Sequence, residues 1–128
     1  MSSKSKGMDA ERDLIHKFWA RSWCAVRVAG SGASKYPSPD IIVGNRIRKI
    51  AIECKSINKN KKYLDKEDVE QLKEFCDIFG AEPWFAIKFP KMNWLFLSLE
   101  DIEKTENGYV VDYKVAERRG LLIDELIK

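Results

Sequence analysis

Two acidic residues and a lysine in the first half of the chain have the types and spacing of a site for metal-assisted hydrolysis. Asp40 follows Pro39, and Glu53 precedes Lys55 by two positions. Carboxylates and water are the ligands that Mg²⁺ prefers, and a substrate phosphate usually completes its coordination shell. A lysine beside the ion can orient an attacking water and offset the charge that develops on phosphorus. The pattern therefore favours a site that acts on phosphates.

A predicted β-hairpin brings these residues together. Residues 40–43 and 49–55 have the composition of strands, and the turn signal at 44–46 is short enough for a hairpin. Because antiparallel neighbours run in opposite directions, Asp40 and Glu53 should lie at the same end of the sheet. Alternation along the second strand directs Glu53 and Lys55 to one face and Cys54 to the other.

Glu11 is a candidate third ligand because of its place on a predicted helix over residues 9–22. It precedes Leu14 by three residues and so projects from the same face as the apolar side chains. An ionised carboxylate is costly there unless something pairs with it. Alone, Glu11 could be an ordinary solvated residue, and Glu53 with Lys55 could be a surface ion pair worth under about 1 kcal/mol. The combination favours a metal site.

Further along the chain, apolar periodicity and turn residues predict an α/β fold in which helices flank a mixed β-sheet. The expected order is a helix, three strands, a helix, two strands and a C-terminal helix, over residues 9–22, 25–29, 40–43, 49–55, 65–79, 84–89, 94–97 and 121–127. We expect a flexible loop at 30–39, a basic connection at 58–63 and a helix stop at Gly80. Residues 99–111 predict only a helical turn, a tight turn and a short extended piece.

The composition is typical of one compact domain with a phosphate-rich partner. The chain has 128 residues, is 45% hydrophobic and carries a net charge of +3. Residues 1–64 hold 14 Lys and Arg against 5 Asp and Glu, so positive charge is concentrated in this half. Such an asymmetry predicts a nucleic-acid partner. The length predicts a single domain over residues 1–128, with a flexible basic tail at 1–7.

Cysteine usage and hydropathy argue against several other classes of protein. The chain has three widely spaced cysteines, one histidine and no CxxC pair, which disfavours a disulfide framework and a zinc site. We find no signal peptide and no apolar run of 18 residues. The sequence therefore predicts a cytoplasmic, nucleoid-associated protein without a membrane partner.

Six segments resemble, in order and spacing, the PD-(D/E)xK nuclease superfamily and, within it, the archaeal Holliday-junction resolvases. The segments are ERDL (11–14), RVAGSG (27–32), PDII (39–42), IECK (52–55), VEQL (69–72) and FG (79–80). The resemblance implies a restriction-endonuclease-like fold and a homodimeric, Mg²⁺-dependent endonuclease, with Mn²⁺ as a substitute ion. It implies cleavage of two opposed strands of four-way junction DNA in recombination and repair. A sliding clamp or a branch-migration helicase is a possible protein partner.

Matched position by position, the resemblance assigns roles to the candidate site residues. It implies that the metal binds Glu11, Asp40, Glu53 and the backbone carbonyl of Cys54. Lys55 matches the catalytic lysine of the family. A small core-facing side chain suffices at position 54, since only the backbone there would bind the ion.

The resemblance also implies DNA-binding and supporting roles. Ser31 matches a serine of a mobile loop that approaches the scissile strand. The expected DNA-binding residues are Arg12, Arg27, Ser31, Ser34, Lys35, Lys59, Lys61 and Lys62. Gln71 would support the metal site, and Phe75 and Phe79 would contribute to the dimer contact. Without the resemblance, the serines could be ordinary polar residues of a loop, and the lysines could belong to a solvent-exposed loop without a role in DNA binding.

Two other functions stay open from the sequence. The same active site could belong to a related nuclease that acts on other duplex or branched DNA. A non-catalytic DNA-binding subunit could have kept the fold, although the complete set of Glu11, Asp40, Glu53 and Lys55 argues against this.

Overall fold

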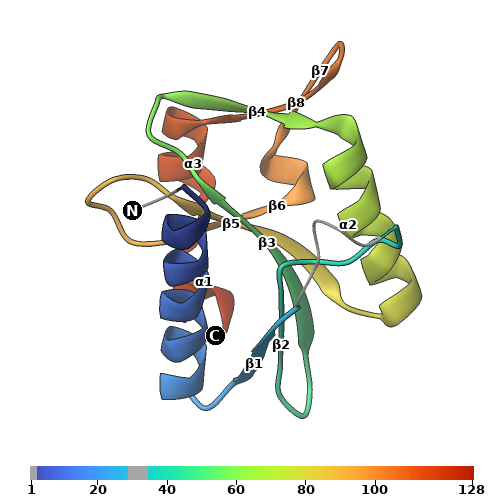
Figure 1. Ribbon diagram of the computed structural model, residues 1–128, viewed down its shortest axis with the longest axis vertical. Helices are drawn as coiled ribbons and strands as arrows, with labels where there is room; N and C mark the ends of the chain where they lie inside the picture. Colours follow the sequence, from blue (N-terminus) through green and yellow to red (C-terminus); the bar gives the residue numbers. More distant parts are fainter. Residues whose placement is uncertain (1–2, 29–34) are drawn as a thin grey trace.

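The computed structural model describes residues 3–28 and 35–128, which form the helices and strands of an α/β fold (Figure 1). The elements are, in order, α1 (Ser3–Ala20), β1 (Cys24–Arg27), β2 (Ile41–Gly44), β3 (Lys49–Ser56), β4 (Lys61–Asp65), α2 (Lys66–Phe79), β5 (Glu82–Lys88), β6 (Leu95–Ser98), the 3-10 helix η1 (Leu99–Asp101), β7 (Glu103–Thr105), β8 (Gly108–Asp112), α3 (Tyr113–Arg119) and α4 (Ile123–Leu126). None of the helices described is long and apolar enough to cross a membrane.

The central sheet positions the candidate site. Its five strands lie in the order β1-β2-β3-β5-β6, with β3 and β5 parallel and the other neighbours antiparallel. Parallel neighbours need a long crossover connection, which β4 and α2 supply between β3 and β5. The predicted mixed sheet is confirmed, and so is the hairpin of β2 and β3, in which Ile41 pairs with Ile52.

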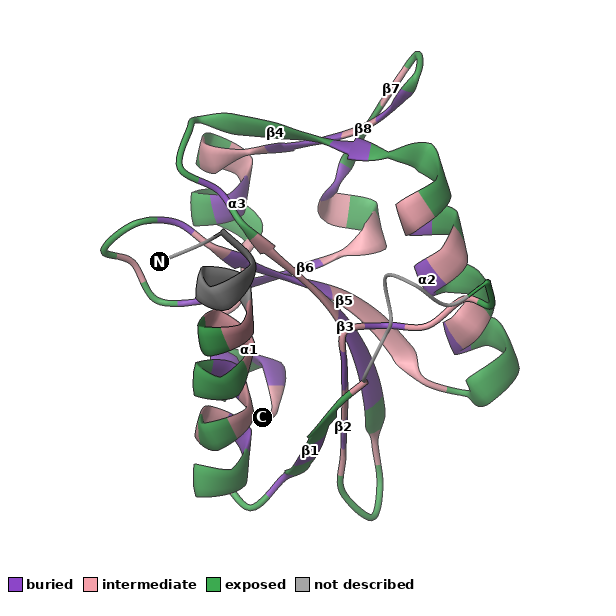
Figure 2. Cartoon of the chain, viewed as in Figure 1, coloured by how far each residue is buried: buried purple, intermediate pink, exposed green. Residues whose placement is uncertain are grey.

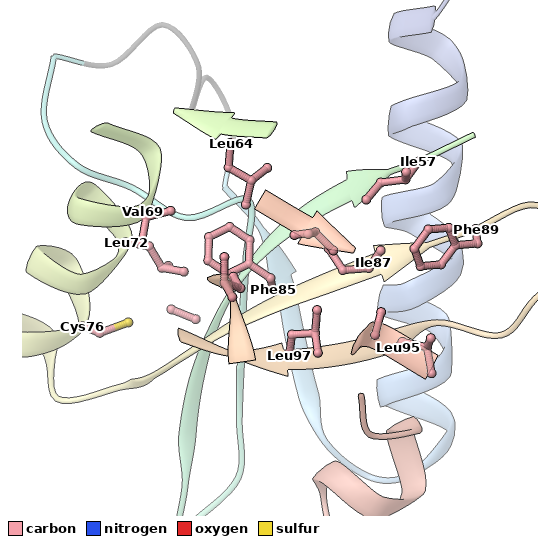
Figure 3. Close-up of a cluster of buried hydrophobic side chains, with 14 residues drawn as sticks. Ile57, Leu64, Val69, Leu72, Cys76, Phe85, Ile87, Phe89, Leu95 and Leu97 are labelled. Atoms are coloured by element: carbon pink, nitrogen blue, oxygen red, sulfur yellow. The ribbon is translucent and has the colours of Figure 1, made fainter. Parts of the chain in front are cut away.

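Each face of the central sheet has its own apolar core because side chains alternate along the strands. On β3, Ile50 and Ile52 pack with α1 and α4, while Ala51 faces α2 and the second sheet. Figure 3 shows the core on the α2 side, where Phe85 and Leu72 belong to one buried cluster. Burial accordingly follows the strands and the inner sides of the helices (Figure 2). The sheet is thus held from both sides.

A second, three-stranded sheet is not apparent from the sequence pattern. Its order is β4-β8-β7, and β4 forms from residues expected to be a basic connection. Leu64 is the buried residue of β4, so the segment lacks the alternation of apolar and polar residues that indicates a strand. Pairing with β8, which is distant in sequence, makes it a strand. The helix α3 is also unpredicted, although the Asp112 carboxylate caps it by accepting from the Lys114 N–H.

The ends of the two long helices show one agreement and one difference. Gly80 ends α2 in the left-handed conformation (φ 81°), and its N–H donates to the Cys76 carbonyl at 2.9 Å, as predicted. The helix α1 begins at Ser3, so the backbone of residues 3–7, expected in a flexible tail, continues the helix. Once the core has nucleated a helix, each added residue gains a hydrogen bond. Residues 1–2 of that tail lie outside the described residues.

Candidate active site

Asp40 and Glu53 are neighbours on adjacent strands. Because Ile41 pairs with Ile52, Asp40 lies opposite Glu53 in the register of β2 and β3. The Asp40 N–H donates to the Ile52 carbonyl (3.0 Å), and the Cys54 N–H donates to Asp40 Oδ2 (2.9 Å). These bonds hold the Asp40 carboxylate against β3. The predicted meeting of the two acidic residues is confirmed.

Burial and neighbouring negative charge disfavour the ionised form of Glu53. Burial, followed by the negative charge of Asp40, raises the pKa of Glu53 from 4.5 to about 8, while Lys55 opposes the shift. The Glu53 carboxyl therefore holds a proton at neutral pH. A cation bound by both carboxylates would supply the missing charge and favour the ionised form.

Glu11 reaches the same region from α1. Burial and then the charge of Asp40 raise the pKa of Glu11, and Arg27 lowers it. The Nε atom of Arg27, on β1, lies 3.8 Å from Glu11 Oε2. The partner that a carboxylate on this helix face requires is thus Arg27, one of the predicted DNA-binding residues.

Lys55 forms an ion pair that reasoning from the sequence missed. Its Nζ atom lies 3.7 Å from Oδ2 of Asp68, in the first turn of α2. The Lys55 side chain is 22% exposed and that of Asp68 42%. The signal in the sequence is weak: an acidic residue directly before the buried Val69, on the helix that crosses back over the sheet.

An open cleft with a volume of about 730 Å³ gives access to these groups. Glu11, Asp40 and Lys55 line it, whereas Glu53 is not part of its wall. Apolar and basic residues from other elements also line the cleft, namely Phe89, Pro90, Trp94, Lys62 and Lys88. The cleft thus contains both carboxylates that could bind a cation and ammonium groups that could bind phosphates.

The donor set fits a hard divalent cation that keeps several water ligands. Asp40 and Glu53 supply two adjacent carboxyl groups, and burial followed by the charge of Asp40 raises the pKa of Glu53, so a cation bound there would favour its ionised form. Within residues 3–28 and 35–128, no three acidic, cysteine or histidine side chains lie close enough together to enclose a metal. Two carboxylates, water and the substrate would therefore form the shell. The predicted ligand role of Glu11 stays a prediction.

The basic connection after β3 lies beside the cleft. Lys59, Lys61 and Lys62 are exposed and line a smaller hollow of about 220 Å³, which shares Ser56 with the cleft. Lys62 also lines the cleft itself. Their predicted contact with phosphate agrees with this placement but stays a prediction.

The other predicted DNA-binding residues are exposed or fall outside the description. Arg12 is exposed and pairs with Asp9 at 3.3 Å. The Lys35 ammonium lies 5.3 Å from the centre of the Tyr36 ring. Two predicted residues lie outside the described residues, namely Ser31 and Ser34.

The predicted supporting and dimer residues all lie on α2. The Gln71 amide donates to Glu67 Oε1 at 3.1 Å, one turn earlier on the same helix. The rings of Phe75 and Phe79 lie 5.2 Å apart, and Phe79 is 43% exposed. The support of the metal site by Gln71 stays a prediction, and so does the dimer contact of Phe75 and Phe79.

Comparison with known proteins decides the family. The sequence profile of the archaeal Holliday junction resolvase family (Hjc) matches residues 2–128. The chain belongs to this family. The predicted resemblance is therefore confirmed, and membership in a nuclease family of this kind implies a divalent metal ion.

Relatives and a solved structure agree with this family. The crossover junction endodeoxyribonuclease Hjc of Archaeoglobus fulgidus is 43% identical over 112 residues, which cover 88% of this chain and 82% of the relative. The protein of the same name from Methanocaldococcus jannaschii is 34% identical and covers 95% and 96%. A solved structure of Archaeoglobus fulgidus Hjc, a Holliday junction resolvase, matches with a TM-score of 0.89 at 39% identity, covering 95% of this chain and all of the other. The predicted fold class is confirmed.

Proposed function

We propose that this protein is a structure-selective endonuclease that resolves four-way DNA junctions by hydrolysing one phosphodiester bond in each of two opposed strands. The observation that carries the proposal is the adjacent pair Asp40 and Glu53, with Asp40 and Lys55 lining an open cleft. The family supports the substrate, since relatives over most of the chain are named crossover junction endodeoxyribonucleases.

Asp40 and Glu53 would hold the metal, which we propose to be Mg²⁺ with Mn²⁺ as a substitute. When bound, the ion supplies positive charge next to the phosphate oxygens. With the ion bound, Glu53 would be held in its ionised form, because the cation would offset the burial and the charge of Asp40 that raise its pKa. Lys55 lines the cleft and presents its ammonium to the attacking water and the scissile phosphate. The water oxygen bonds to phosphorus as the bond from phosphorus to the 3′-oxygen breaks. The attacking water loses a proton to solvent, the 3′-oxygen takes one up from solvent, and the other product carries a 5′-phosphate.

Junction recognition should depend on shape and on phosphate spacing. The basic residues near the cleft, Lys59, Lys61 and Lys62, come from a loop and the edge strand β4. Such groups contact the backbone and carry no information on base sequence.

A homodimer would present two sites to a junction of near-twofold symmetry. Apolar surface at the end of α2 supports this proposal. Ile78 is 81% exposed and Phe79 is 43% exposed, and Phe75 stacks beside Phe79. Grouped, exposed apolar side chains of this size mark interaction surfaces.

The decisive experiment compares cleavage of a four-way junction and a linear duplex of the same sequence by the wild type and Asp40→Asn, with Mg²⁺. Asparagine keeps an oxygen that can accept from the Cys54 N–H, so the variant should fold. We expect junction cleavage to fall by more than about 100-fold while junction binding is retained. Glu70→Gln, which removes an exposed charge on α2, is the control.

Retained cleavage by Asp40→Asn would refute the proposed site. Equal cutting of the linear duplex by the wild type would refute the substrate and favour the alternative of a less selective nuclease. Junction binding without cleavage by the wild type would favour the non-catalytic subunit.

A further inference from the structure

We propose that Asp68 is a positioning residue, which holds the Lys55 ammonium in place for the reaction; this inference rests on the proposed function of the site. The Lys55 Nζ atom lies 3.7 Å from Asp68 Oδ2, and the two residues come from different elements. Lys55 stands on β3 beside Glu53, whereas Asp68 stands on α2. The contact therefore ties the helix to the catalytic strand.

The packing of α2 determines where the Asp68 carboxylate lies. Val69, Leu72 and Cys76 are buried in the core between α2 and the sheet, which sets the rotation of the helix about its axis (Figure 3). Asp68 directly precedes the first of these residues and lies at the flank of the buried face. A carboxylate at this flank reaches across to Lys55 on the sheet.

The ion pair between Lys66 and Glu70, both on α2, shows by contrast why Asp68 can hold the Lys55 side chain in place. Lys66 and Glu70 are also 3.7 Å apart, but their side chains are 60% and 59% exposed. Solvent screens such a pair, and its members stay mobile. The side chains of Lys55 and Asp68 are 22% and 42% exposed, so their attraction is screened less.

Lys55 needs such a partner because its ammonium stands at the end of four rotatable bonds. Without a partner, the ammonium samples many positions, and most of them are unproductive for a phosphate in the cleft. Misplacing a reacting group by about 1 Å can lower a rate by about 100-fold. Asp68 does not line the cleft, so we assign it no contact with substrate. Its main effect is through Lys55, and its charge also helps to raise the pKa of Glu53.

The test uses the full chain with the substitutions Asp68→Asn and Asp68→Glu. The matched control is Glu70→Gln, which removes another α2 carboxylate from its lysine partner. Single-turnover cleavage of a four-way junction with saturating enzyme and Mg²⁺ measures the chemical step, and gel shifts without metal measure junction affinity. We expect Asp68→Asn to slow cleavage by roughly 10- to 100-fold. Its junction affinity and melting temperature should match those of Glu70→Gln, and Asp68→Glu should recover most of the rate.

A double-mutant cycle separates positioning from a structural role. If Asp68 acts through Lys55, Asp68→Asn should slow the Lys55→Ala variant by less than about twofold. An equal loss in both backgrounds would overturn the proposal, as would a cleavage rate of Asp68→Asn equal to that of Glu70→Gln.

A measurement independent of cleavage keeps the two proposals apart. NMR relaxation of the Lys55 side-chain methylenes should show greater mobility in Asp68→Asn than in the wild type and in Glu70→Gln. Unchanged mobility would overturn the role of Asp68 whatever the substrate is. A wild type that cuts no junction would overturn the proposed function, and the NMR comparison would still decide on Asp68.

Discussion

Glu53→Gln is expected to stabilise the metal-free protein at alkaline pH, although it should abolish cleavage. In the folded chain, burial and the charge of Asp40 raise the pKa of Glu53 from 4.5 to about 8. An acid whose pKa is raised by folding binds its proton more tightly in the folded state. The free energy of unfolding therefore falls as pH rises from about 4.5 to 8 and stays low above that range. Glutamine keeps the shape without the charge, so the variant should not show this fall.

The size of the effect follows from the shift in pKa. A pKa shift of one unit is worth about 1.4 kcal/mol. The rise in the pKa of Glu53 from 4.5 to about 8 therefore limits the loss of folding free energy at alkaline pH to about 5 kcal/mol. We expect the variant to be more stable by about 2 to 4 kcal/mol at pH 8.5 and by less than about 1 kcal/mol at pH 5.

The assay is equilibrium unfolding in urea with EDTA at both pH values, followed by the fluorescence of the four tryptophans. Protein concentration is held constant because the stability of the proposed dimer would depend on it. Glu70→Gln, with a side chain 59% exposed, is the control and should change stability by less than about 0.5 kcal/mol at either pH. Adding Mg²⁺ should stabilise the wild type at pH 8.5 more than Glu53→Gln.

Two results would refute this reasoning. One is equal stability of the wild type and Glu53→Gln at pH 8.5. The other is a gain of the same size at pH 5, which would indicate better packing of glutamine and no role for the buried charge.

Two further predictions concern stability and assembly. Arg48 donates to both Glu82 carboxylate oxygens and to the Leu126 carbonyl, each at 2.8 Å, so Arg48→Ala should cost about 1 to 3 kcal/mol in urea unfolding at pH 7. The pKa of Glu82 is lowered, first by its bond to Arg48, so this loss should shrink as pH falls through that pKa; a loss independent of pH would contradict the assignment. Phe79→Glu places a charge beside the exposed Ile78 and should halve the mass measured by light scattering after gel filtration. A variant that keeps a dimer mass would place the contact elsewhere, and a wild type with the mass of one chain would refute the proposed homodimer.

The acidic pair could be predicted because its geometry depends on local information. A tight turn joins β2 and β3, and the apolar residues of both strands must face the same core. This fixes the pairing of Ile41 with Ile52, and Asp40 then has to meet Glu53. The end of α2 at Gly80 could also be predicted, because it depends on the conformation of one residue.

The second sheet could not be predicted because it depends on contacts between distant segments. Lys61, Lys62 and Tyr63 carry no apolar alternation and become a strand only by pairing with β8. Their position in turn brings Lys62 to the wall of the cleft. The local sequence pattern does not indicate that a segment pairs with a strand distant in sequence.

The sequence by itself determined that two carboxylates and a lysine meet at one end of the sheet, since residue types and short-range register place them there. Only the tertiary structure decided the state of these groups. Burial and the charge of Asp40 raise the pKa of Glu53, and Lys55 is paired with Asp68. Both facts depend on burial and charge contributed by α2 and the surrounding strands. Electrostatic interactions sum over distance in space, and positions along the chain do not reveal that distance.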